Sequence, residues 1–267
     1  MPILPPPTPG STFLKRHDEP FRPTLADAGR LVLESGIGAV EVSPGGADEM
    51  NTTGSREAEF MGRITASATH ELRNVLAIVK ESAGLVEDLV KASETRGPPD
   101  AARLLKATGR IEAQVARGAE LVTRLNRFAH SLDQDIRSVD LDEEVRQVAF
   151  LSQRFARKKL QTVHVEAGDG VVPFQGSSLH VQMALFSAVE LFLDQLPEGG
   201  VLTLRAGGRD GRAAARLAGT AGDGATLPGL HDLAGWPELK EGLADLGFSA
   251  EASPEGYEVL LLFDGGG

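Results

Sequence analysis

The chain has 267 residues, 41% of them hydrophobic, which is enough for one or two packed domains with additional tails. The absence of cysteine excludes disulfides and thiolate metal sites, and a formal net charge of −11 disfavours binding to nucleic-acid phosphates. No run reaches the ~20 apolar residues of a membrane helix, and the first residues lack the pattern of a signal peptide. We therefore expect a cytoplasmic protein without membrane association.

Residues 1–54 are rich in proline, glycine and small polar residues, which is typical of a mostly disordered arm. One apolar patch interrupts this composition and leaves room for a short structured piece. The patch consists of residues 31–33, Ile37, Val40 and Val42. Translation from Met50 and a genuine N-terminal tether are both compatible with the sequence.

A long helical pattern without proline runs over residues 55–95. Apolar residues recur along it at spacings of four and three, as in a coiled coil, with one threonine as a polar break. These positions, the first seam, are Met61, Thr65, Ala68, Leu72, Leu76, Val79, Ala83 and Val86. A glycine followed by two prolines, at residues 97–99, ends the pattern.

A second helix is predicted over residues 100–132, again with an apolar seam. The second seam consists of Leu104, Ile111, Val115, Gly118, Val122, Leu125 and Leu132. Two long helices joined by a tight turn form an antiparallel hairpin. One hairpin cannot bury both seams and the flanking leucines and Phe128, so we expect residues 55–137 to form a four-helix bundle as a homodimer.

Beyond residue 138 the pattern becomes mixed. A short extended segment at Val139 leads into a helix that ends near Lys159. Strands are predicted at 162–166, 200–205, 212–217, 248–252 and 257–263, and helices at 178–195 and 237–246. Strands on one side and helices on the other form an α/β sandwich over residues 138–264. The predicted fold class is therefore α+β, a helical hairpin followed by an α/β sandwich.

The candidate for chemistry is His70, within the run His70-Glu71-Leu72-Arg73-Asn74. At about 100° per residue, His70 lies roughly opposite the first seam, so its imidazole is expected to face solvent. Asn74 lies one turn further on the same face, and Glu71 could orient the ring or accept its proton. A lone surface histidine on a coiled coil is the ordinary alternative.

This run, within a hairpin of suitable length, resembles the H-box of the dimerisation and histidine-phosphotransfer domain of sensor histidine kinases. The resemblance covers residues from about 55 to 135. It implies that His70 is the phosphoacceptor, that Glu71 is its acid/base partner, that Asn74 holds a water for dephosphorylating a partner, and that Arg73 occupies the family's basic position. Many members have proline where this chain has Val75, so we expect a straighter first helix.

The order of elements after residue 138 resembles the ATP-binding domain of the same kinases, a Bergerat-type sandwich. That resemblance requires an asparagine on the helix at 178–195, and Glu190 stands there instead. It also requires an Asp-x-Gly-x-Gly loop, which fails around Asp223, and a glycine-rich lid, which is missing between Thr226 and Leu246. We therefore expect a degenerate domain that serves as a docking scaffold, with no cofactor; ATP and Mg²⁺ belong only to the alternative of an active kinase.

The remaining histidines suggest no metal site. They are His17, His130, His164, His180 and His231, and none is paired with acids or other histidines at a ligand spacing. Each is expected to be structural or solvated. Trp236 is expected to anchor a core or its rim.

These observations predict a histidine phosphotransfer protein of a two-component phosphorelay. Phosphoryl groups would pass between His70 and the aspartates of response-regulator receiver domains, with an upstream hybrid kinase as a possible donor. The expected docking surface is Arg63, Ser67, Glu71 and Asn74. Two alternatives remain: an active sensor histidine kinase that autophosphorylates at His70, and a regulator of the phosphatase or decoy type.

Overall fold

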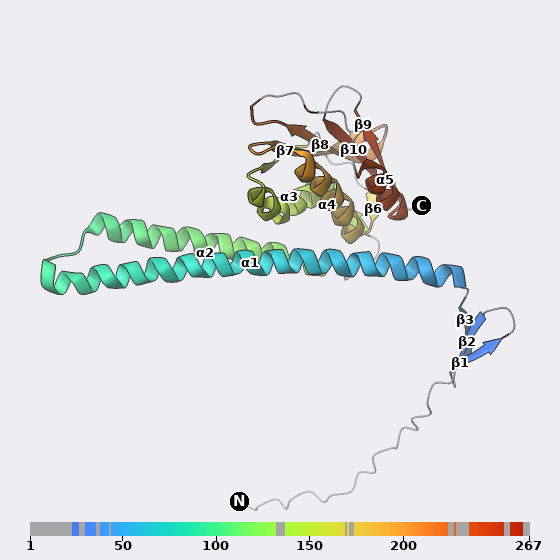
Figure 1. Cartoon of the computed structure of the whole chain (residues 1–267), viewed down its shortest axis with the longest axis horizontal. Coiled ribbons are helices and arrows are strands. Elements are labelled where there is room, and N and C mark those ends of the chain that lie inside the picture. The colour runs from blue at the N-terminus through green and yellow to red at the C-terminus, as the bar shows by residue number, and fades with distance from the viewer. Residues whose placement is uncertain are drawn as a thin grey trace, which may run out of the picture. The chain divides into compact units, whose positions relative to one another are not determined.

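The structure is a computed structural model of the α+β class (Figure 1). It describes residues 23–26, 30–35, 38–42, 44–131, 137–168, 170, 174–223, 227, 235–253 and 257–263. The chain divides into two compact units, Met1–Gly54 and Ser55–Gly267. In the described part, no helix combines the length and the apolarity that crossing a membrane requires.

The first unit contains a three-stranded antiparallel sheet in the order β1-β2-β3. The strands are β1 (Pro23–Ala26), β2 (Arg30–Ser35) and β3 (Gly38–Val42). The apolar patch of the arm supplies β2 and β3, because its alternating and β-branched residues suit a strand. Ile37 and the other residues between the strands lie outside the described residues. The arm therefore carries more regular structure than its composition predicts.

The hairpin consists of α1 (Pro44–Arg96) and α2 (Ala101–His130), which run antiparallel side by side (Figure 1). Helix α1 begins eleven residues earlier than predicted, since helix formation continues through the small polar residues before Ser55. Gly97 adopts φ +90° in the turn, where a side chain would be strained. Asp100 caps α2 by accepting a hydrogen bond from the backbone N–H of Ala102 at 2.9 Å.

Within its own hairpin, helix α1 buries the first seam only in part. Ile64, Ala68, Val75 and Ser82 are buried, whereas Leu76 of the first seam is 59% exposed. The two helices approach closely where Val75 meets Gly118, since a Cβ on that glycine would lie 3.1 Å from the Val75 side chain. Part of the first seam is thus not used within one chain.

Among the described residues of the hairpin, six large apolar side chains are exposed. They are Leu76, Leu85, Val90, Leu105, Val115 and Val122. Three of them lie on each helix, so neither helix buries all of its large apolar side chains within the hairpin. The hairpin therefore has apolar surface left for a further partner.

The sandwich contains a five-stranded mixed sheet in the order β5-β7-β8-β10-β9. Its strands are β5 (Thr162–Val165), β7 (Val201–Arg209), β8 (Arg212–Thr220), β9 (Phe248–Ala252) and β10 (Glu258–Phe263). The pair β5–β7 is parallel and the other pairs are antiparallel. Two short strands, β4 (Arg137–Val139) and β6 (Phe174–Gly176), pair separately.

Three helices pack against one face of this sheet: α3 (Leu141–Lys158), α4 (Ser178–Gln195) and α5 (Trp236–Asp245) (Figure 1). Helix α4 is buried along most of its length because its sequence is apolar on nearly every side. Glu144, 1% exposed, accepts hydrogen bonds from Ser178 Oγ at 2.6 Å and Gln182 Nε2 at 2.7 Å. These bonds fix α3 against α4, since a buried carboxylate without partners would be costly.

The hairpin and the sandwich share one hydrophobic core. The ring of Phe60 in α1 lies 5.4 Å from that of Phe128 in α2 and 5.3 Å from that of Phe186 in α4. Phe155 of α3 extends the cluster, with its centroid 5.4 Å from that of Phe186. The sandwich is therefore packed against the base of the hairpin through aromatic contacts.

Two non-glycine residues adopt positive φ in the described part of the chain, Leu160 at +57° and Asp210 at +54°. Leu160 follows α3 in a C-terminal cap, in which the N–H of Gln161 bonds to the carbonyl of Ala156 at 3.0 Å. Glycine is usual at this position, and a side chain there costs about 1–2 kcal/mol. Asp210 and Gly211 form the tight turn between β7 and β8, where such φ values are normal.

Candidate functional site

His70 lies on α1 near the middle of the hairpin, and its side chain is exposed, as its position opposite the first seam predicts. Its Nδ1 lies 3.4 Å from Nδ2 of Asn74, one helical turn further on. No described residue makes a hydrogen bond with Nε2. The ring is thus held weakly on one side while its outer nitrogen faces solvent.

The side chain of Glu71, unlike that of the neighbouring His70, is largely shielded from solvent. Its side chain is 14% exposed and binds two arginines, Arg117 of α2 and Arg157 of α3, the latter at 2.9 Å. None of the described hydrogen bonds joins Glu71 to His70. Arg117 and Arg157 were missed by sequence reasoning, because exposed helical arginines are common and only the fold brings these two to one carboxylate.

The expected docking surface is corrected by the packing of the sandwich. Ser67 is buried, Arg63 binds Glu190 of α4, and Glu71 binds α3. Of the four predicted residues, only Asn74 lies exposed beside His70 without a bond to the sandwich. The prediction is wrong for the buried Ser67, and Arg63 and Glu71 are bound by the sandwich, because the exposed side of an isolated helix changes once a second domain packs on it.

Arg73 is exposed, and it makes no ion pair with the residues that the structure describes. Val75, at the position where the resembling family often has proline, is 3% exposed and packs against Gly118. Its backbone N–H is available to the helix, and α1 continues without interruption to Arg96. The structure thus contains an uninterrupted helix at this position, and the expected straightness of α1 stays a prediction.

Glu190, which stands where a nucleotide-binding asparagine is expected, forms an ion pair with Arg63 of α1. The guanidinium donates to both carboxylate oxygens, one of them at 2.8 Å from Nη1. A cavity of about 260 Å³ lies beside this pair between α1, α4 and α5. Arg56, which also lines it, pairs with Asp245 of α5. The cations at this cavity are therefore already matched by the chain's own carboxylates.

The glycines of the run at residues 217–226 have structural explanations. A Cβ on Gly219 would lie 2.4 Å from the ring of Tyr257, and one on Gly222 would lie 2.3 Å from the carbonyl oxygen of Gly199. Both glycines are thus required by close packing within the domain. Residues 224–226 and 228–234, the latter within the stretch where a lid is missing, lie outside the described residues.

Tyr257 fills the space above Gly219. It is 6% exposed and packs edge-on against Phe192, with ring centroids 5.0 Å apart. Its hydroxyl is buried without a hydrogen-bond partner among the described residues. Burial raises the pKa of Tyr257 to about 12.

The other histidines lie on different helices and strands or outside the described residues. His17 and His231 lie outside the described residues, while His164 is exposed on β5. His180 Nε2 lies 2.9 Å from Glu57 Oε1, which is a structural contact of the kind expected for this residue. That pair joins α4 to α1 and was hidden by a sequence separation of 123 residues. No group of three or more potential metal ligands occurs among the described residues.

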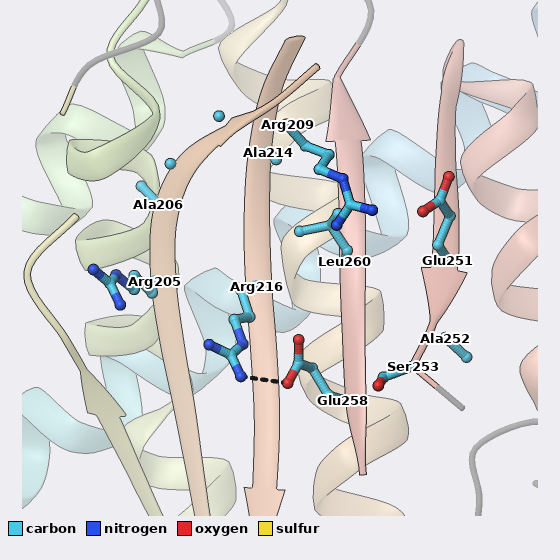
Figure 2. A pocket seen from close by; sticks show the side chains of 12 residues that line it. Arg205, Ala206, Arg209, Ala214, Arg216, Glu251, Ala252, Ser253, Glu258 and Leu260 are labelled. Carbon is cyan, nitrogen blue, oxygen red and sulfur yellow. Dashed lines mark hydrogen bonds and ion pairs between the residues drawn. The ribbon is translucent and has the colours of Figure 1, made fainter. Parts of the chain in front are cut away.

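A second groove, of about 370 Å³, lies on the outer face of the sheet, away from the helices (Figure 2). Its arginines lie on β7 and β8 and its glutamates on β9 and β10, and Arg216 donates to Glu258 at 2.5 Å. This bond raises the pKa of Arg216. None of the residues predicted to carry chemistry lines this groove. Opposite charges on neighbouring strands are typical of a solvated sheet face.

Neither a family model nor a curated protein matches the chain. Solved structures that match include a bacterial phosphotransferase, at 11% identity over 77% of this chain and 96% of that chain, with a TM-score of 0.41. The histidine kinase ThkA in complex with the response regulator protein TrrA matches at 14% identity over 91% and 76%, with a TM-score of 0.39. The Acinetobacter baumannii histidine kinase AdeS matches at 13% identity over 72% and 95%, with a TM-score of 0.37. Similarities this small do not place the chain in a family.

Proposed function

We propose that the protein is a histidine phosphotransfer protein of a two-component system, in which His70 exchanges phosphoryl groups with the aspartates of response-regulator receiver domains. The observation that carries the proposal is an exposed imidazole on a helical hairpin, with an asparagine at 3.4 Å from its inner nitrogen. An upstream hybrid kinase is the expected source of phosphate. Arg73, exposed nearby, would add positive charge for an anionic partner.

The contact with Asn74 bears on which nitrogen reacts. When the side-chain amide of Asn74 turns its oxygen toward the ring, this oxygen accepts a hydrogen bond from the Nδ1–H of His70. That tautomer leaves a lone pair on Nε2 toward solvent. Nε2 attacks the phosphorus of an aspartyl phosphate, the bond from phosphorus to the carboxylate oxygen breaks, and the carboxylate leaves. The reverse sequence returns the phosphoryl group to an aspartate.

Glu71 would not be the acid/base partner in this reaction. Its carboxylate is neutralised by Arg117 and Arg157, and no hydrogen bond links it to the ring. We therefore propose Asn74 as the orienting residue and Glu71 as a structural link between the hairpin and α3.

The sandwich would act as a scaffold that does not bind nucleotide. A triphosphate with Mg²⁺ does not fit the residues present, since Glu190 would repel it and is already bound to Arg63. The glycines that could cradle phosphates are packed against Tyr257 and Gly199. This favours phosphotransfer over the alternative of an ATP-dependent kinase.

A homodimer would bury the apolar side chains that the hairpin leaves exposed. Pairing two hairpins creates a four-helix bundle, in which such residues form the central layers. His70 would remain on the outer wall of that bundle, open to a receiver domain. Each dimer would then present two phosphoacceptor sites.

The test is acceptance of labelled phosphate from phosphorylated receiver domains of the host. The wild-type protein should become labelled by at least one receiver, and the His70→Ala variant should not, because no other described histidine shares this environment. His164→Ala is a matched control, since His164 is also exposed but lies on the sheet. Full labelling of the His70→Ala variant would refute the proposal.

A second candidate function is a phosphatase-type regulator, favoured by the exposure of Asn74 one turn from His70. In that case the His70→Ala variant would still accelerate decay of a phosphorylated receiver, and the Asn74→Ala variant would not. Under phosphotransfer, loss of His70 removes all acceleration. Measuring receiver dephosphorylation with both variants separates the two functions.

A further inference from the structure

The end of α3 carries an apolar side chain that the fold does not use. Leu160 is 64% exposed, and it is the one exposed large apolar residue of the sandwich among those described. It also adopts φ +57°, in a cap position where glycine or asparagine is usual. Exposure and backbone strain at this residue are both unfavourable.

Basic residues surround this leucine. Arg154, Arg157, Lys158 and Lys159 all lie within the last turns of α3 or directly after it, in a chain of net charge −11. Arg157 binds Glu71, and Lys159 binds Asp194. Arg154 and Lys158 make no ion pair with the described residues. Two cations are thus left to face a partner at this point of the surface.

This end of α3 lies beside the phosphoacceptor. Arg157 reaches Glu71 at 2.9 Å, and Glu71 is adjacent to His70 in the helix. A cavity of about 230 Å³ opens between α1, α3 and α4 here, lined among others by Arg63, Phe155 and Lys158. The packed sandwich therefore ends next to His70, and a domain that reaches the ring from solvent meets both the hairpin and α3.

We infer that the end of α3, formed by Arg154, Lys158 and Leu160, is a second docking surface for the receiver domain that exchanges phosphate with His70. The inference rests on the proposed function. The partner's face around an aspartyl phosphate is anionic, which complements the two cations, and Leu160, two residues after Lys158, supplies an apolar contact. This surface replaces Arg63, Ser67 and Glu71 as the expected docking site, because Ser67 is buried and the other two bind residues of the sandwich.

The ordinary explanation of these cations is that they complement the negative end of the α3 dipole. That effect would account for Arg157 and Lys158 in the last turn. It does not account for an exposed leucine in a strained conformation. The two explanations differ in what the Leu160→Gly variant does: the dipole explanation predicts no change in phosphotransfer.

The experiment uses the full chain and the receiver domain that labels it fastest. The variants are Leu160→Gly and Lys158→Glu, singly and together. The Leu160→Gly variant should melt at or above the wild-type temperature, since glycine relieves the strained φ. The double variant should lower the second-order rate constant for transfer at low receiver concentration about tenfold, with the rate at saturation nearly unchanged.

Two control variants make the same kinds of substitution at other positions of the chain. Asp210→Gly relieves the other positive φ, in the β7–β8 turn, and Lys240→Glu reverses an exposed cation on α5. Neither should alter transfer. The wild-type rate should also fall with added salt, and the Lys158→Glu variant should show a smaller fall. Equal rates for the double variant and the wild type would overturn the inference.

Binding without chemistry separates this inference from the proposed function. Titrating the same receiver into the His70→Ala protein should show an affinity that falls when Leu160→Gly and Lys158→Glu are added. If the wild type accepts no phosphate but this binding and its loss are observed, phosphotransfer is wrong and the docking surface stands. If the wild type accepts phosphate and the added changes leave binding intact, the docking surface is wrong.

Discussion

Two adjacent residues, His70 and Glu71, have opposite surroundings. The imidazole is exposed, while the neighbouring carboxylate is 14% exposed and bound by two arginines from other helices. A rotation of about 100° around the helix separates a reactive position from a structural one. The chemistry of a residue in this helix therefore depends on which neighbour packs against its side of the rod.

Tyr257 provides a pH test at the same scale. It is the single tyrosine of the chain, and burial raises its pKa to about 12. The unfolded chain releases this proton near pH 10, whereas the folded chain retains it. Titration of Tyr257 therefore leaves the free energy of unfolding unchanged below pH 10 and lowers it as the pH rises toward 12, by about 2–3 kcal/mol in total.

We expect the Tyr257→Phe variant to avoid this loss. Its hydroxyl is buried without a described partner, so its removal should leave the free energy of unfolding at neutral pH unchanged or slightly higher. Urea unfolding at pH 7 and pH 11 measures both effects, and tyrosinate absorbance of the wild type gives the pKa directly. A pKa near 10 would show that the hydroxyl is accessible to water.

At the scale of elements, α1 contacts different parts of the molecule along its length. Arg63 bonds to α4 and Val75 packs against Gly118 of α2, while His70 and Asn74 are exposed. Leu76 is also exposed. Because residues on one side of a long helix can meet different partners at different points along it, one heptad-like pattern does not identify which residue meets which partner.

Replacing Leu76 and Val122 with aspartate should convert the proposed homodimer into a monomer. Both residues are more than half exposed in a single chain, so the monomer should keep its helical content while a buried charge would prevent pairing. Sedimentation equilibrium measures the mass of each form. Leu160→Asp, outside the hairpin, should stay dimeric; a wild-type chain that sediments as a monomer at high concentration would contradict the proposed dimer.

At the scale of the whole second unit, the sandwich is attached to the hairpin by an aromatic cluster and several ion pairs. Phe60, Phe128 and Phe186 supply the apolar contact. The ion pairs join Arg63 to Glu190 and Arg124 to Glu143, and a further polar contact joins His180 to Glu57. Partly exposed pairs of this kind contribute up to about 1 kcal/mol each, so they orient the sandwich more than they stabilise it.

Restoring the asparagine at position 190 should not restore nucleotide binding. The Glu190→Asn variant removes the repulsive carboxylate, yet Gly219 and Gly222 remain packed against Tyr257 and Gly199. We expect no heat of binding for ATP with Mg²⁺ in either the wild type or this variant, with a loss of at most about 1 kcal/mol in stability. Saturable ATP binding by the wild type, together with labelling of His70, would favour the kinase alternative.

Much of the local structure could be predicted from the sequence. The helix Ser178–Gln195 and the strand Phe248–Ala252 have the bounds predicted from their patterns. The exposure of His70 also followed from helical periodicity alone. Glycine and proline fixed the turn of the hairpin, since both restrict the backbone wherever they occur. These features depend on interactions between residues close in the chain.

The tertiary structure decided which residues surround His70. Arg157 is 86 residues from Glu71 in the chain, and Glu190 is 127 residues from Arg63. No local pattern predicts such pairs, because the energy of an ion pair depends on distance in space and on the water excluded around it. The β-strands of the first unit and the exposed Leu160 were likewise visible only in the fold. The sequence alone thus determined the helix that carries the imidazole, and packing over long separations determined what a partner meets beside it.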